Sequence, residues 1–166
     1  MSELRTNRIV PRDGLPAGAS GGIVQMKYTT GTTNSTTTST GFVDMGIDVT
    51  ITPTRSDSKF LICWSSPSQQ PNTQAGSSYT TIYRNDTTNI GHGTYGLAMV
   101  GNYSASETVT AQATFSVFDA PNTTSAVTYS IYGRSHTSNG TAYISHANSR
   151  WTLTVMEVSG QFHKYK

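Results

Sequence analysis

The sequence predicts an all-β protein: an antiparallel two-sheet sandwich, jelly-roll-like, with an extended N-terminal arm. Apolar residues recur at every second position in several short segments, which is the pattern of half-buried strands. Clusters of glycine, proline, asparagine and aspartate separate those segments, as turns do. Serine and threonine supply most of the polarity, and threonine is β-branched, so the composition favours strands over helices. No segment shows the apolar period of an amphipathic helix.

In the first half of the chain, two segments carry the strongest strand signals. The segment 47–53 alternates between β-branched apolar residues on one face and Asp or Thr on the other. The segment 59–64 is apolar on both faces, which predicts a central strand covered on both sides, with Cys63 packed in the core. Further strands are expected at 22–28, 78–84 and 95–101, and the polar stretch 29–40 is expected to be a loop or an edge strand.

In the second half, the segment 109–117 has the most regular alternation. Its apolar residues, including Phe115 and Val117, point one way, and its Thr, Gln and Ser residues point the other. Three more strands are expected at 126–134, 141–145 and 150–158. The sequence therefore predicts about nine short strands in total.

The dipeptide Asn139-Gly140 predicts a β-hairpin, because both residues tolerate the positive φ angles of a type I′ turn. The turn would pair the strand before it with 141–145. In that register the imidazoles of His136 and His146 lie several rungs apart, too far for one metal ion. The histidines therefore predict no metal site.

The chain divides into three segments: an arm at 1–22, a sandwich domain at 23–159 and a C-terminal tail at 160–166. Prolines remove amide donors from the arm, and its glycines favour an adaptable backbone, so it cannot build a core. We predict that the arm docks on another protein chain through three apolar and three arginine side chains: Leu4, Ile9, Val10, Arg5, Arg8 and Arg12. A disordered tail is the alternative.

Nucleic acid is not expected as a partner. The formal net charge of the chain is only +2, and Glu3 and Asp13 leave the arm nearly neutral. Phosphates call for denser Lys and Arg. A membrane helix is not expected either, because no apolar run is long enough.

Catalytic residues, metals and cofactors are not predicted. Cys63 is the single cysteine, so no intrachain disulfide can form, and its buried strand makes it an unlikely nucleophile. The acidic residues are scattered, and none of the usual nucleophile, phosphate-binding or zinc motifs is present. Carboxylates brought together from distant segments, as in a glycosidase, are the case that sequence alone leaves open.

Four tyrosines in the middle third of the chain are candidate contacts for a sugar or a protein partner: Tyr79, Tyr83, Tyr95 and Tyr103. Each lies beside loops rich in Asn, Thr, Gly and Ser. A tyrosine offers a flat apolar face and a hydroxyl, so such loops can stack on and hydrogen-bond a sugar or a protein. The alternative is that these rings cap the ends of the sandwich.

Three stretches of the sequence carry a resemblance to a known group of proteins. The first is SELRTNRIVPRDGLPAGASGGIVQ at the N-terminus; the others are FDAPNTTSAVTYSIYGRS and RWTLTVMEVSG in the second half. They resemble small virion proteins of tailed bacteriophages of marine bacteria and cyanobacteria, often described as tail-fibre-like. The N-terminal stretch is the most specific of the three, whereas residues 65–108 show no resemblance.

The resemblance implies a homotrimeric structural protein on the exterior of the virion, assembled in the cytoplasm of a bacterial host. Residues 1–22 would dock onto other virion proteins, and the β-body would touch a glycan or protein of the host surface. The alternative is a capsid decoration protein whose arm grips the head. A glycan depolymerase is a more remote alternative.

Overall fold

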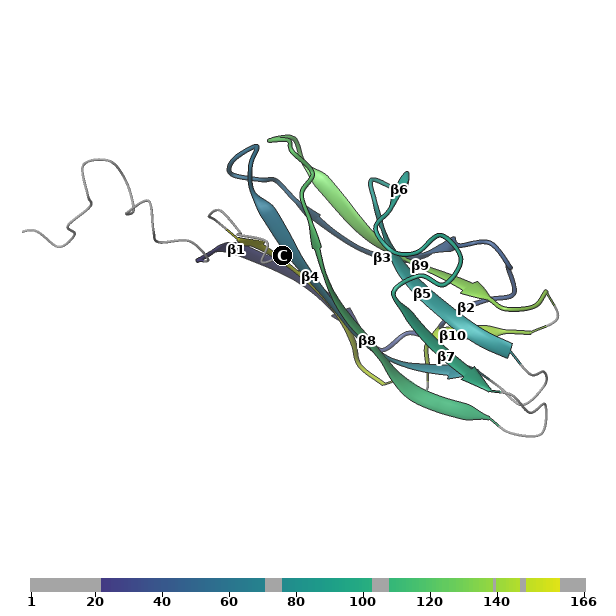
Figure 1. Ribbon diagram of the computed structural model, residues 1–166. Helices are drawn as coiled ribbons and strands as arrows, with labels where there is room; N and C mark the ends of the chain where they lie inside the picture. Colours follow the sequence, from purple (N-terminus) through teal and green to yellow (C-terminus); the bar gives the residue numbers. More distant parts are fainter. Residues whose placement is uncertain (1–21, 71–75, 103–107, 139, 147–148, 159–166) are drawn as a thin grey trace, which may run out of the picture.

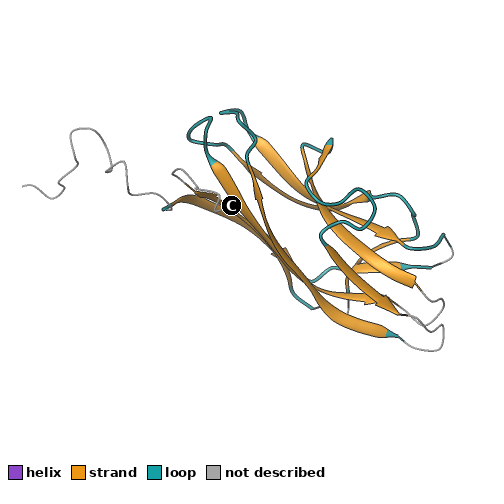
Figure 2. Ribbon diagram, in the orientation of Figure 1, coloured by secondary structure: helices purple, strands orange, loops and turns teal. Residues whose placement is uncertain are grey.

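The computed structural model describes residues 22–70, 76–102, 108–138, 140–146 and 149–158. These residues form strands and loops (Figure 2), and no helix among them is long and apolar enough to cross a membrane. The predicted all-β fold is confirmed. Apart from Gly22, the predicted arm lies outside the described residues, and so does the predicted tail.

The strands form two antiparallel sheets that pack as a sandwich (Figure 1). In chain order they are β1 (Ile23–Gly31), β2 (Ser35–Thr37), β3 (Val43–Ile51), β4 (Lys59–Gln70), β5 (Gly76–Arg84), β6 (Thr88–Asn89), β7 (Ala98–Asn102), β8 (Val109–Asp119), β9 (Val127–Ser135), β10 (Ala142–Ser145) and β11 (Trp151–Val158). The first sheet has the order β1-β11-β4-β10-β2, with β8 on the other side of β4. The second sheet has the order β3-β9-β5-β6, with β7 also paired to β5.

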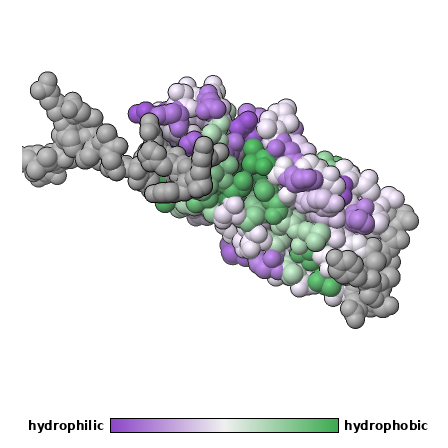
Figure 3. Space-filling view, viewed as in Figure 1, coloured by the Kyte–Doolittle hydropathy of each residue, from purple (hydrophilic) through white to green (hydrophobic). Residues whose placement is uncertain are grey.

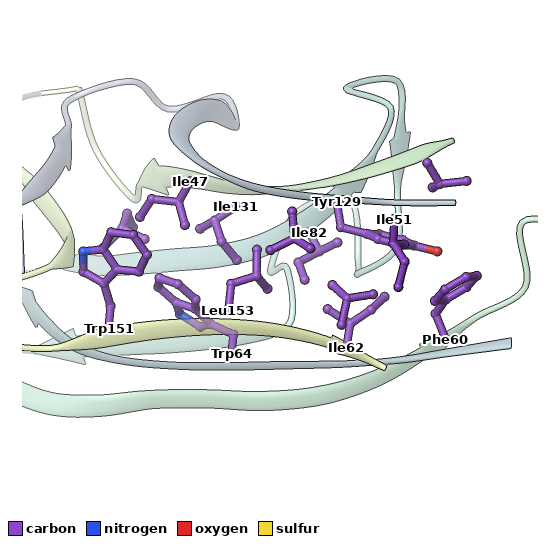
Figure 4. Close-up of a cluster of buried hydrophobic side chains, with 14 of the residues drawn as sticks. Ile47, Ile51, Phe60, Ile62, Trp64, Ile82, Tyr129, Ile131, Trp151 and Leu153 are labelled. Carbon is purple, nitrogen blue, oxygen red and sulfur yellow. The ribbon is translucent and has the colours of Figure 1, made fainter. Parts of the chain in front are cut away.

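The core lies between the two sheets and is built from the inward position of each alternating strand. Figure 4 shows Phe60, Ile62 and Trp64 of β4 facing side chains of the second sheet. The rings of Trp64 and Trp151 stack with centroids 6.1 Å apart. Burying each of these large side chains contributes about 1.5–3 kcal/mol, which holds the sheets together.

One edge of the core is closed by partly buried side chains. Phe115 and Val117 of β8 pack against the core there, as do Ile90 and Leu97 from the segment between β6 and β7. Figure 3 shows hydrophobic residues gathered along the middle of the molecule. The alternation predicted for 109–117 places Ala113, Phe115 and Val117 toward the core, as expected, whereas Ala111 is exposed.

The hairpin predicted at Asn139-Gly140 is wrong. The strand before it, β9, belongs to the second sheet, whereas β10 pairs with β2 and β4 in the first sheet. The chain crosses the sandwich here because doing so buries Ile144 completely against Gly133 of the opposite sheet. A Cβ atom added at Gly133 would lie 2.3 Å from Ile144 Cγ1, so only glycine permits this approach.

The prediction for 59–64 is half right. The strand β4 is central, because β11 and β8 pair with it on opposite sides. Only one of its faces is covered, however: Phe60 and Ile62 are fully buried, whereas Leu61 and Cys63 are partly exposed on the outside of the sheet. Cys63 is thus not a core residue. A two-sheet sandwich covers one face of each sheet, and periodicity alone cannot show that the second face stays open.

Candidate functional site

The candidate site is the outer face of the second sheet, where aromatic and charged side chains gather. The core residues Ile82 of β5 and Ile131 of β9 point inward, so their neighbours point outward. The register pairs Tyr79 of β5 with Arg134 of β9. We call this the tyrosine face and define it by seven residues: Tyr79, Tyr83, His92, Tyr95, Tyr132, Arg134 and His136.

One end of the tyrosine face is a stacked pair of rings. Tyr83 and Tyr132 are diagonal neighbours on β5 and β9, and their ring centroids lie 4.0 Å apart at an interplanar angle of 25°. The Tyr132 hydroxyl donates a hydrogen bond to Asp86 Oδ1 at 3.3 Å, and the Ser130 hydroxyl donates to the same oxygen at 2.9 Å. These contacts fix a carboxylate beside the two rings.

Asp86 owes its position to an unusual backbone. Asn85 and Asp86 both have positive φ angles, 49° and 56°, at the turn between β5 and β6. Such angles are tolerated best by Gly, Asn and Asp. Burial raises the pKa of the Tyr132 hydroxyl, and the charges of Asp86 and Asp44 raise it further, so the phenol stays protonated as a donor.

The middle of the tyrosine face is organised around Arg134. Its guanidinium carbon lies 4.6 Å from the Tyr79 ring centroid and 5.8 Å from that of Phe42, a cation–π arrangement. Arg134 Nη1 donates to the carbonyl of Thr40 at 2.8 Å. The Tyr79 hydroxyl is 3.1 Å from His136 Nδ1. Tyr79 is only 3% exposed, so it supports the face instead of presenting its own ring.

The most exposed tyrosine of the tyrosine face is Tyr95, at 59% exposure. His92 stacks on it, with centroids 5.1 Å apart at 23°, and Tyr79 packs beside it at 6.0 Å. His92 Nδ1 accepts hydrogen bonds from the backbone N–H groups of Thr94 and Tyr95, both at 3.1 Å. His92 therefore holds its loop in shape, and a neutral imidazole in this position carries its proton on Nε2.

Gly96 brings this loop close to the sheet. Its φ is +67°, and a Cβ atom there would lie 2.5 Å from the carbonyl oxygen of Thr80. The backbone of Leu97 donates to that same carbonyl at 2.8 Å. Glycine is therefore required for Tyr95 to reach Tyr79.

The structure brings together three of the four predicted tyrosines, Tyr79, Tyr83 and Tyr95, while Tyr103 lies outside the described residues. Tyr79 lies within β5 and Tyr83 lies next to its last residue, and both side chains are on the outer face of the sheet. The predicted arm residues also lie outside the described part of the chain. Sequence reasoning missed Tyr132 and Arg134. The alternation of 126–134 nevertheless places both on the face of the strand that is opposite to the face of Ile131.

The tyrosine face can stack on a flat apolar surface and can offer hydroxyl, imidazole, guanidinium and carboxylate groups around it. This combination suits sugars and polar protein loops. Among the described residues, no group of three or more His, Cys, Asp or Glu side chains could hold a metal ion. His136 contacts the ring of Tyr79, whereas His146 contacts the ring of Tyr143.

Comparison with known proteins adds no relative. No protein-family model matches the chain, and no curated protein matches it significantly.

Proposed function

We propose that the chain is a structural protein of the exterior of a tailed-phage virion, part of a tail fibre or a similar appendage. In this proposal a jelly-roll-like body is docked through residues 1–22 and touches the host surface with the tyrosine face. The protein binds and does not catalyse. The observation that supports the proposal best is the continuous set of ring contacts from His92 through Tyr95 and Tyr79 to His136.

The chemistry of the face favours a glycan over an apolar ligand. Tyr95 presents an exposed ring on which the C–H face of a sugar can stack. Asp86 supplies carboxylate oxygens, and the hydroxyls of Tyr83 and Tyr132 can bond sugar hydroxyls beside it. Because backbone N–H groups already bond His92 Nδ1, the loop is ordered before binding, which lowers the entropic cost of recognition.

The host-contact part of the proposal is tested by binding of the full chain to an array of bacterial surface polysaccharides. We expect Tyr95→Ala to weaken binding at least about tenfold, because the ring on which the sugar stacks is lost. Tyr28→Ala is the matched control, since Tyr28 is an equally exposed tyrosine (63%) on the other sheet. Failure of the chain to bind any polysaccharide, or equal losses in both variants, would contradict this part.

The location in the virion is tested by counting copies in particles that carry the chain. An appendage contributes a small symmetric number of copies at the tail, whereas a decoration protein covers the head in tens to hundreds of copies. A count of tens to hundreds of copies on the head would contradict the appendage and support the capsid decoration protein instead. Steady release of sugar from a bound polysaccharide would instead point to the depolymerase.

A further inference from the structure

The edge strand β1 has its apolar side turned outward. Val24, Met26 and Tyr28 are 45%, 55% and 63% exposed, whereas the residues between them, Gln25 and Lys27, are polar. In a half-buried strand the apolar side ordinarily faces the core. The outward position of the apolar side chains of β1 therefore indicates a surface that another molecule covers.

The apolar residues of β1 continue as a row across four strands of the first sheet. The register aligns Met26 of β1 with Met156 of β11, Met156 with Leu61 of β4, and Leu61 with Phe118 of β8. Phe118 is 56% exposed, and Leu61 and Met156 are partly exposed. We call this surface the outer face of the first sheet and define it by the outward residues of β1, β11, β4 and β8.

The outer face of the first sheet carries almost no charge. The row next to the apolar one consists of Tyr28, Thr154, Cys63 and Ser116. In the described parts of the four strands, the remaining outward positions are uncharged except for Lys59, at the margin of the face. A neutral face meets its own copy without like-charge repulsion, whereas a partner selected by charge would require ionic groups here.

We propose that a second copy of this chain packs on the outer face of the first sheet. Four strands about 4.8 Å apart, each contributing about eight residues at roughly 3.3 Å per residue, give a face of about 500 Å². Two such faces together remove about 1,000 Å² from water, the lower bound of specific protein interfaces. An interface of this size belongs with weak, reversible associations.

This contact goes beyond the proposed function and does not depend on it. The tyrosine face lies on the opposite side of the sandwich, because it is formed by the outward residues of the other sheet. Packing through the first sheet therefore leaves every tyrosine face open. The two tyrosine faces of such a pair point in opposite directions, so each remains free to bind a ligand of its own.

Sedimentation of the full chain over a range of concentrations tests the contact without any ligand. We expect the mass to rise above that of a monomer with concentration, and Met26→Glu and Phe118→Glu each to raise the dissociation constant at least about tenfold. Met99→Glu is the matched control, because Met99 is 55% exposed on the second sheet. Circular dichroism establishes that each variant is folded. A monomer at every concentration, or self-association that both variants leave unchanged, overturns the proposal.

Cys63 gives a second measurement on the unmodified protein. It is the single cysteine and lies on this face, 3.5 Å from the hydroxyl of Ser116. We expect its reaction with a thiol reagent to slow severalfold as the protein concentration rises, because the second copy covers it. Labelling that is equally fast at all concentrations overturns the proposal. Labelling that is equally slow at all concentrations does so too, since the cover is then part of the same chain.

Discussion

The carboxylate of Glu157 accepts a hydrogen bond of 2.5 Å from the hydroxyl of Ser58, although the Glu157 side chain is completely buried. Three further donors bond the same carboxylate: Gln25 Nε2 at 2.6 Å, the backbone N–H of Thr54 at 2.8 Å and its hydroxyl at 2.6 Å. The donors come from β1 and from the loop between β3 and β4. Glu157 of β11 therefore ties that loop and the edge strand to one point.

Substitution of Glu157 by glutamine should destabilise the fold by about 2–3 kcal/mol. The glutamine amide group carries N–H donors of its own. One of these would face the donors of Ser58, Thr54 or Gln25, which now bond to carboxylate oxygens. Urea unfolding measures the change, and Asp57→Asn is the matched control, because Asp57 is an exposed carboxylate in the same loop and its ion pair with Arg55 is exposed as well. Equal stability of the Glu157→Gln variant and the parent chain would mean that the hydrogen bonds do not hold this corner.

The same carboxylate predicts a dependence of stability on pH. Burial by itself raises the pKa of Glu157, but the hydrogen bonds from Ser58, Thr54 and Gln25 outweigh it and hold the pKa below its usual 4.5. A depressed folded-state pKa stabilises the protein above pH 4.5, and that contribution is lost as the pH falls through the lower folded value. Thermal unfolding from pH 7 to pH 3 should therefore show a steeper acid loss in the parent chain than in Glu157→Gln. Parallel curves would refute the linkage.

Local periodicity predicted most strands and their buried sides. The inward placement of Ile47, Val49 and Ile51 follows from alternation alone, because each strand repeats its environment every second residue. Alternation also groups Met26 with Tyr28, but it does not say which side of a strand meets the core. That choice depends on where β1 lies in its sheet, which is a property of the whole fold.

For a similar reason, the sequence alone did not predict which sheet each strand joins. The turn signal of Asn139-Gly140 is local, whereas the position of β10 is decided by the burial of Ile144 against Gly133 across the sandwich. The candidate site was partly predictable: tyrosine chemistry selected Tyr79 and Tyr95. The contact between them also depends on the backbone of Gly96, which no composition reveals.

The ion pair between Arg84 and Asp119 should contribute to holding the two sheets together. Arg84 Nη1 lies 2.8 and 2.9 Å from the carboxylate oxygens of Asp119, and the Tyr129 hydroxyl donates to Asp119 Oδ2 at 2.8 Å. Burial first, and then the bond to Asp119, raise the pKa of the Tyr129 hydroxyl, so it remains a donor. Arg84→Met should cost about 2 kcal/mol, because it leaves a largely buried carboxylate with fewer partners.

A double-mutant cycle separates this coupling from simple loss of packing. Arg84→Met, Asp119→Asn and the combined variant are compared by urea unfolding. We expect the combined variant to be less destabilised than the sum of the two single variants, by about 1 kcal/mol. Strict additivity would show that Arg84 and Asp119 contribute independently.

Gly96→Ala should disrupt the tyrosine face while leaving most of the sandwich intact. The added methyl group would meet the carbonyl oxygen of Thr80 at 2.5 Å, and the φ of +67° is strained for alanine, so the loop must move away from β5. Tyr95 would then lose its contact with Tyr79.

Gly93→Ala is the matched control in the same loop, because a Cβ atom there has nothing within 4 Å. We expect loss of stability by about 1–3 kcal/mol and weaker polysaccharide binding for Gly96→Ala alone. If Gly93→Ala weakens binding as much, general loop mobility and not the packing of Tyr95 on Tyr79 governs recognition.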